Sequence, residues 1–149
     1  MRLNAALCCL AALLVTFGAR AQQQAPQTFL LGAWTGGIFP PPTVVTADQC
    51  LAQPTVIFTR DVVMRASLME LSYIQRVIET VRGTGNGLEI RFDPAAPTPS
   101  SALTGFSPSD TGFGCDSPDA LHVERVSQNQ IRFPGCSDFP FPLVRCPAG

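Results

Sequence analysis

The sequence has 149 residues and a net charge of −1, and all ten of its basic residues are arginines. Such a chain lacks the basic field that nucleic-acid binding requires, and the absence of lysine excludes catalysis by a lysine nucleophile. Fourteen prolines and twelve glycines disfavour long helices and favour short strands joined by turns.

The first 21 residues are expected to be a cleavable export signal. Met1 and Arg2 give a positively charged start, and residues 3–17 form a run that is apolar apart from Asn4 and Thr16 and is short for a bilayer span. The alternative is a membrane anchor, but residues 19–21 (Ala-Arg-Ala) fit the pattern that signal peptidase accepts. We expect cleavage after Ala21 and a periplasmic or extracellular mature chain that has no transmembrane segment.

The mature chain is expected to begin with a flexible leader, residues 22–27, followed by one disulfide-stapled domain, residues 28–149. Four cysteines remain after the expected cleavage, and an even number in an exported chain predicts disulfides, here two. Three pairings can form, and an expected hairpin between Cys115 and Cys136 favours that pair. The other disulfide is then expected to join Cys50 to Cys146.

Neither a metal nor another cofactor is expected. The cysteines lack Cys-x-x-Cys spacing, and only one histidine is present. Three acids near Cys115, namely Asp110, Asp116 and Asp119, lack the spacing of a calcium loop and are interpreted as solvated turn residues.

Two segments share a pattern that predicts β-hairpins. Residues 78–81 (Ile-Glu-Thr-Val) and 123–126 (Val-Glu-Arg-Val) are each followed, after a turn-rich connection, by Ile-Arg-Phe. We therefore expect Tyr73–Arg82 to pair with Leu88–Phe92, and Leu121–Val126 to pair with Gln130–Phe133.

A helix at about 67–82 is the alternative for the first of these segments. Leu71, Ile74, Val77, Ile78 and Val81 recur at helical spacing, and residues 67–70 imitate a capping box. The repeated Ile-Arg-Phe favours the hairpins, because a helix does not explain why both segments share it.

Further strands are expected at Thr28–Trp34, Thr55–Arg60 and Asp61–Ala66, and a long surface loop at residues 95–114. The expected fold is all-β, a small antiparallel up-and-down barrel or sandwich with long Pro/Gly-rich loops. An α+β fold with the helix at about 67–82 remains the alternative.

Residues 32–34 (Gly-Ala-Trp) open the first expected strand. This Gly-x-Trp motif resembles the opening of lipocalin-like β-barrels, including small bacterial periplasmic protease inhibitors. The resemblance implies that Trp34 plugs one barrel end and that an arginine from a late strand, Arg132 or Arg145, stacks on it. The chain departs from such barrels in its shorter length, its two expected disulfides and the prolines after the tryptophan. No function is transferred, since a fold does not determine function.

Few residues point to catalysis. His122 is the only histidine, the mature cysteines are expected to be oxidised, and a Gly-x-Ser-x-Gly motif is lacking. Glu79 and Glu124 occupy matching positions in the two hairpins and could approach each other as glycosidase carboxylates do. Cross-strand pairing with arginines is the more ordinary role for both glutamates.

Five phenylalanines lie in Pro/Gly-rich segments outside the expected strands: Phe39, Phe106, Phe113, Phe139 and Phe141. Aromatic residues on rigid loops are favoured anchors for partners, so these are candidate binding residues. The alternative is that they close the barrel ends.

The working hypothesis is an exported, non-catalytic binding domain for a protein partner or a small apolar ligand. Inhibition of an extracytoplasmic protease is one version, with residues 22–27 entering the protease cleft. One alternative is a small extracytoplasmic hydrolase that uses either the pair Glu79 and Glu124 or the single His122. The other alternative is a structural envelope protein.

Overall fold

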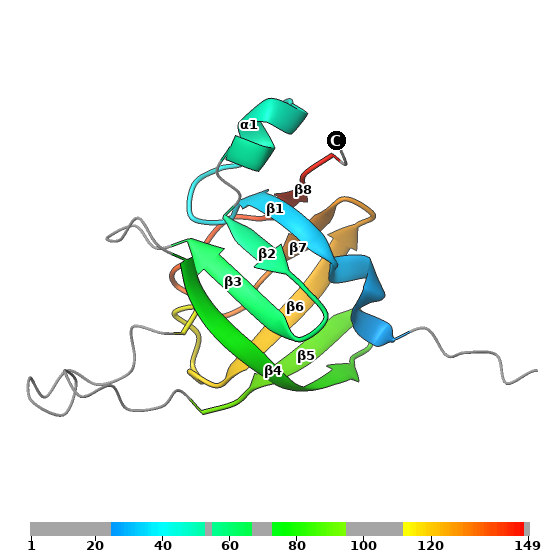
Figure 1. The fold of residues 1–149 in the computed structure, drawn as a ribbon, viewed down its shortest axis with the longest axis vertical. Coiled ribbons are helices and arrows are strands. Elements are labelled where there is room, and N and C mark those ends of the chain that lie inside the picture. The colour runs from blue at the N-terminus through cyan, green and yellow to red at the C-terminus, as the bar shows by residue number, and fades with distance from the viewer. Residues whose placement is uncertain (1–24, 53–54, 67–72, 95–111, 148–149) are drawn as a thin grey trace, which may run out of the picture.

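The computed structural model describes residues 25–52, 55–66, 73–94 and 112–147. The expected export signal, and parts of the expected leader and of the expected 95–114 loop, lie outside the described residues. Eight antiparallel strands close into an up-and-down barrel, in which each strand pairs with its sequence neighbours and the last pairs with the first (Figure 1). The all-β expectation is confirmed, and the architecture is the barrel rather than the sandwich.

The elements follow one another around the barrel in chain order. They are the 3₁₀ helix η1 (Pro26–Leu30), β1 (Gly32–Gly36), α1 (Ala47–Ala52), β2 (Val56–Phe58), β3 (Val62–Ala66), β4 (Tyr73–Gly83), β5 (Gly87–Phe92), β6 (Ala120–Ser127), β7 (Gln130–Arg132) and β8 (Leu143–Arg145).

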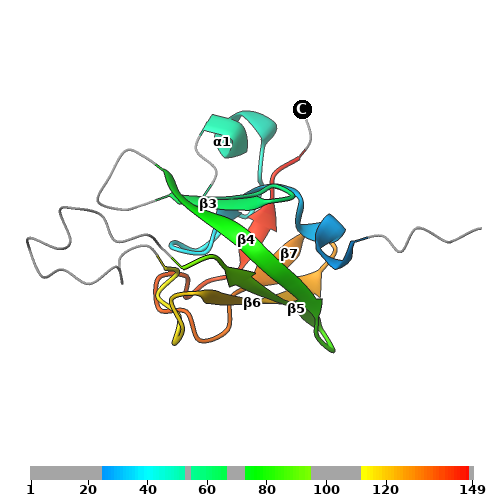
Figure 2. The ribbon, with the colours of Figure 1, turned by 60° about the horizontal axis from the view of Figure 1, so that its bottom comes forward.

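The two ends of the barrel differ in how the strands are joined. Short connections between β2 and β3, β4 and β5, and β6 and β7 lie at the end where β1 begins, which we call the η1 end. The longer connections lie at the opposite end, called the loop end (Figure 2). The helix α1 lies outside the barrel, on the side opposite β5.

The barrel interior is a packed apolar core. Along β5, for example, Leu88, Ile90 and Phe92 are buried, while Glu89 and Arg91 between them face outward. An eight-stranded barrel is just wide enough for side chains to fill it. The buried cluster consists of Leu30, Trp34, Val56, Phe58, Val63, Leu88, Ile90, Phe92, Phe113, Leu121, Val123, Ile131, Phe133, Cys136, Phe139 and Leu143.

Both expected hairpins are present, since β4 pairs with β5 and β6 pairs with β7. The repeated Ile-Arg-Phe is equivalent in the two, because residues 90–92 and 131–133 each place an exposed arginine between two buried apolar residues. The preceding halves are not equivalent. Glu79 is the extra residue of a β-bulge, whereas Glu124 is regularly paired with Arg132 on β7.

The helix alternative at 67–82 is wrong for residues 73–82, which belong to β4, and residues 67–72 lie outside the described part. The misleading spacing has two structural causes. Arg76 occupies the inward position between Ile74 and Ile78, and the bulge then moves the next inward position to Val81. Apolar residues at 74, 78 and 81 therefore imitate a helical face on a bulged strand.

Trp34 is fully buried at the η1 end, where its indole Nε1 donates a hydrogen bond of 2.8 Å to the Leu30 carbonyl. The guanidinium carbon of Arg145 lies 4.4 Å from the centre of the tryptophan ring. The same guanidinium donates to the carbonyls of Phe29 and Leu31. Arg145 thus joins β8, Trp34 and η1 in one contact.

Two expectations about this end need correction. Arg132 does not stack on Trp34; it lies on the outer face of β7, where its Nε is 2.5 Å from Oε2 of Glu124. Residues 28–34 do not form one strand, because Pro26 starts η1 and β1 begins only at Gly32. Backbone carbonyls of that segment accept hydrogen bonds from the side chains of Trp34 and Arg145 instead of from a neighbouring strand.

The helix α1 was not expected from the sequence. Thr46 immediately before it and Gln49 at its third position match the capping-box pattern, which is the signal that could have identified it. Within the described ranges, no helix has the length and hydropathy needed to cross a membrane.

Both expected disulfides are present. Cys115–Cys136 joins the segment before β6 to the segment after β7, and Cys50–Cys146 joins α1 to the end of β8. Their partners are 21 and 96 residues apart in the sequence. In the chain-entropy model, closing loops of these lengths contributes about 3 and about 4–5 kcal/mol to stability.

Replacing Arg145 by alanine should lower the free energy of unfolding by about 2–3 kcal/mol, because the ring contact and the hydrogen bonds to η1 are lost together. Arg132→Ala is the matched control and should leave stability nearly unchanged, since that side chain is exposed. Urea denaturation followed by tryptophan fluorescence measures both. Equal losses for the two variants would contradict this assignment.

Candidate functional site

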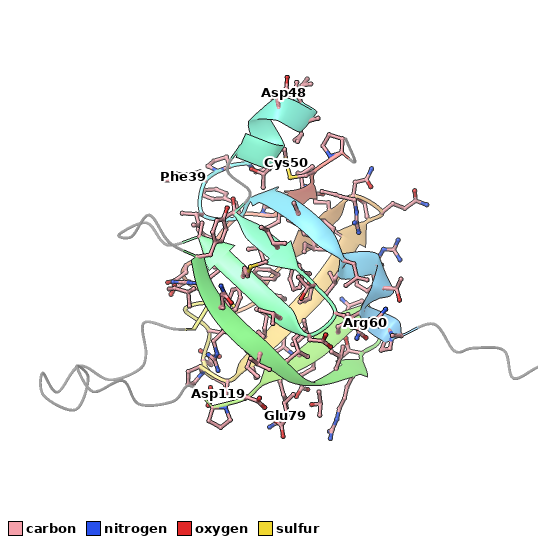
Figure 3. All side chains as sticks on the ribbon, viewed as in Figure 1. Phe39, Asp48, Cys50, Arg60, Glu79 and Asp119 are labelled. Carbon is pink, nitrogen blue, oxygen red and sulfur yellow. A yellow bond between two sulfur atoms is a disulfide. The ribbon has the colours of Figure 1, made fainter. Side chains whose placement is uncertain are left out.

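The connection between β1 and α1, residues 37–46, is here called the Phe39 loop. It carries no charged side chain. Phe39 is 66% exposed and Val44 is 71% exposed, although both are apolar. Figure 3 shows Phe39 on this loop, outside the barrel.

The base of the Phe39 loop is fixed to the segment that precedes β8. The Gly37 amide donates to the Pro142 carbonyl at 3.1 Å, and the Phe141 amide donates to the Gly37 carbonyl at 2.9 Å. Gly37 has φ +79°, and a Cβ there would lie 2.7 Å from the ring of Phe139. Glycine is therefore required at this position, because any side chain would both strain the backbone and overlap the core.

The far end of the loop is also held. It leads into α1, where Cys50 is buried and bonded to Cys146. Phe39 and Val44 are thus exposed on a loop that is anchored at both ends.

The five candidate phenylalanines fall into different environments. Phe113 and Phe139 are each 2% exposed and belong to the core cluster, so they are not available to a partner. Burial follows from the small barrel's need to fill its loop end, which confirms the alternative interpretation for these two. Phe39 and Phe141 are exposed, and Phe106 lies outside the described residues.

A groove of about 620 Å³ lies beside the Phe39 loop on the outside of the barrel. Its lining is mixed, with Thr43, Asn129, Gln130 and the charged Arg145 among the residues that line it. It is lined by the loop residues Pro41, Pro42, Thr43 and Val45 and, from the β6–β7 turn through β8 to the C-terminal segment, by Asn129, Gln130, Val144, Arg145, Cys146 and Pro147.

Two arginines that the sequence analysis did not single out close the loop end from inside. The guanidinium carbon of Arg65 on β3 lies 5.8 Å from the ring centres of both Phe113 and Phe139. Its Nη1 is 2.7 Å from Oδ2 of Asp138. The cation therefore joins the barrel wall to the segment after β7.

Arg76 on β4 makes the corresponding contacts to the segments around β5 and β6. Its guanidinium carbon lies 4.9 Å from the centre of the Phe92 ring, and its Nη2 is 2.5 Å from Oδ1 of Asp119. It also donates to the carbonyls of Pro118 and Asp93. The alternation along β3 and β4 puts both arginines at inward positions, and this was the signal that could have identified them. It is a weak signal, because a charged residue at an inward position is unusual.

The structure does not bring Glu79 and Glu124 together. Glu124 faces Gly87 at the start of β5, whereas Glu79 lies beside the opposite end of β5, next to Phe92. Figure 3 shows Glu79 on the outside of the barrel. A glycosidase pair needs its carboxyl groups about 5–10 Å apart across one substrate, which this placement does not provide.

Glu124 is also unsuited to donate a proton. A hydrogen bond from Arg132, together with the Arg132 charge and a hydrogen bond from Asn86, holds the pKa of Glu124 below its ordinary value. A catalytic acid needs the opposite shift. His122 is exposed on the outer face of β6, opposite Glu89 on β5.

The three acids near Cys115 do not form a cluster in the described chain. Asp119 pairs with Arg76, Asp116 is exposed, and Asp110 lies outside the described residues. Among the residues that the structure describes, no group of three or more His, Cys, Asp or Glu is arranged to hold a metal ion.

Comparisons of the chain with protein-family models, with curated proteins and with solved structures found no match. The candidate site is therefore defined by its geometry alone. It consists of the exposed Phe39 loop, Phe141 beside its base and the adjoining groove.

Replacing Phe113 by alanine should lower the free energy of unfolding by about 3–5 kcal/mol, because it removes a ring from the core. Phe39→Ala should cost less than about 0.5 kcal/mol, since that ring is mostly in solvent. Thermal or urea denaturation measures both variants. A large loss for Phe39→Ala would show that this residue serves packing rather than binding.

Proposed function

We propose that the mature chain is an exported, non-catalytic binding domain that contacts a protein partner through the Phe39 loop and Phe141. The observation that carries this proposal is the contrast between a barrel filled by its own side chains and an uncharged loop that exposes Phe39 and Val44. Binding at the outside of the barrel follows from this contrast.

The shape of the surface favours a protein over a small apolar ligand. Small-molecule sites are concave and bury most of the ligand, whereas Phe39 and Val44 protrude into solvent. Only a partner with its own pockets can bury such side chains. Depletion of charge and enrichment of aromatic residues are typical of the centre of a protein interface.

Export is supported by the two disulfides, because such bonds persist mainly in oxidising compartments. The contact of Arg145 with Trp34 is the one that the resemblance to lipocalin-like barrels implies, and such barrels include periplasmic protease inhibitors. An extracytoplasmic protease is accordingly one candidate partner.

Site-specific photocrosslinking tests this proposal. p-Benzoylphenylalanine placed at position 39 or 141 in the exported protein should give the same discrete crosslinked product in intact cells, identified by mass spectrometry. The control is the same residue at position 122, which is exposed on the outer face of β6. It should give no such product, because no residue of β6 lines the groove beside the loop.

Two results would count against the proposal. The first is an identical crosslinking pattern at all three positions, which would indicate random collision. The second is the absence of any product at positions 39 and 141 under conditions in which the folded protein is present.

A further inference from the structure

The Phe39 loop contains the sequence Phe-Pro-Pro-Pro at residues 39–42. Proline fixes its own φ near −65° and disfavours the helical region for the residue before it. Residues 39–41 each precede a proline, and residues 40 and 41 are themselves prolines, so stereochemistry favours the polyproline II conformation at these two positions. In the structure neither a helix nor a strand includes residues 39–42, and the chain bends at residues 37–39 before it enters the prolines.

A polyproline II helix has three residues per turn, so a partner that binds residues 39–42 in this conformation would meet positions 39 and 42 on one face. Phe39, Pro40 and Pro42 are exposed, whereas Pro41 is half-buried. A Cβ built on Gly36 would lie 3.0 Å from Cβ of Pro41, so this proline packs against the end of β1. One face of the segment is attached to the barrel, and the other two face solvent.

The backbone of the segment is also free to bind. Within the described chain, the carbonyls of residues 39–42 accept no hydrogen bond. They can therefore accept hydrogen bonds from a partner. Polyproline II ligands are bound in this way by grooves lined with aromatic side chains, because the preformed helix loses little entropy on binding.

We infer that residues 39–42 are a polyproline II ligand for a partner protein with an aromatic-lined, uncharged groove. This inference rests on the proposed function and names the chemistry of the partner. The loop carries no charged residue, so it offers nothing that a charged groove could pair with. Phe39 supplies an apolar anchor at the start of the ligand, and Pro42 supplies the second contact on the same face.

The similar sequence Phe-Pro-Phe-Pro at residues 139–142 lacks the exposed first phenylalanine and the free backbone groups of residues 39–42. Phe139 is buried, and both the Phe141 amide and the Pro142 carbonyl are hydrogen-bonded to Gly37. This second segment therefore provides a control of matched composition.

Isothermal titration of the purified mature protein with an isolated EVH1 domain, a WW domain and an SH3 domain tests the inference, since these bind polyproline II in aromatic-lined grooves. We expect saturable one-to-one binding by at least one domain. Phe39→Ala and Pro42→Ala should each weaken that binding at least about 10-fold, as loss of an interface anchor does. Pro140→Ala should change it less than about 2-fold.

Thermal melts of the three variants establish that each remains folded before binding is compared. The inference is overturned if none of the three domains binds the native protein, or if Pro42→Ala binds as tightly as Pro140→Ala. A discrete crosslinked partner at position 39 together with no binding by these domains would reject the polyproline II mode and leave the protein-binding proposal standing. If there were neither a crosslinked partner at position 39 nor binding by these domains, both the polyproline II mode and the protein-binding proposal would be rejected.

Discussion

Closure of eight short strands leaves a narrow interior that side chains must fill, and the rest of the molecule depends on how this is done. The chain fills it with apolar residues and closes both ends with arginines that lie on aromatic rings, Arg145 on Trp34 and Arg65 on Phe113 and Phe139. Burial, and then the charge of Arg125, lower the pKa of Arg145 from its ordinary value. The backbone carbonyls and the ring compensate for that burial.

Filling the barrel has a consequence for function. Many barrels of this size hold a ligand at the centre, whereas the interior of this barrel is lined by the buried apolar cluster, and the proposed binding surface lies outside it. The loop that exposes Phe39 is held by hydrogen bonds at its base and by the Cys50–Cys146 disulfide beyond it. A rigid loop loses little entropy when it binds, which makes exposed apolar residues on it effective anchors.

Much of the fold could be predicted from the sequence, because turn residues and alternating apolar residues are local signals. The hairpins and the barrel belong to this group, whereas the tryptophan–arginine contact was implied by the resemblance of the Gly-x-Trp motif to lipocalin-like barrels, which left Arg132 and Arg145 both open. The bulge at Glu79 could not be predicted, because it depends on pairing with β5. The same holds for the inward Arg65 and Arg76, which find partners only when distant segments pack. Sequence also could not separate buried Phe113 and Phe139 from exposed Phe39, because all three lie in similar Pro/Gly-rich surroundings.

Trp34 is the only tryptophan and lies inside the barrel, so its fluorescence reports directly on the interior. Titration of the native protein with a long-chain fatty acid, followed by Trp34 emission, tests whether the barrel is filled. We predict no saturable change in intensity or wavelength. A saturable one-to-one change in Trp34 emission would show a ligand cavity inside the barrel and contradict the account.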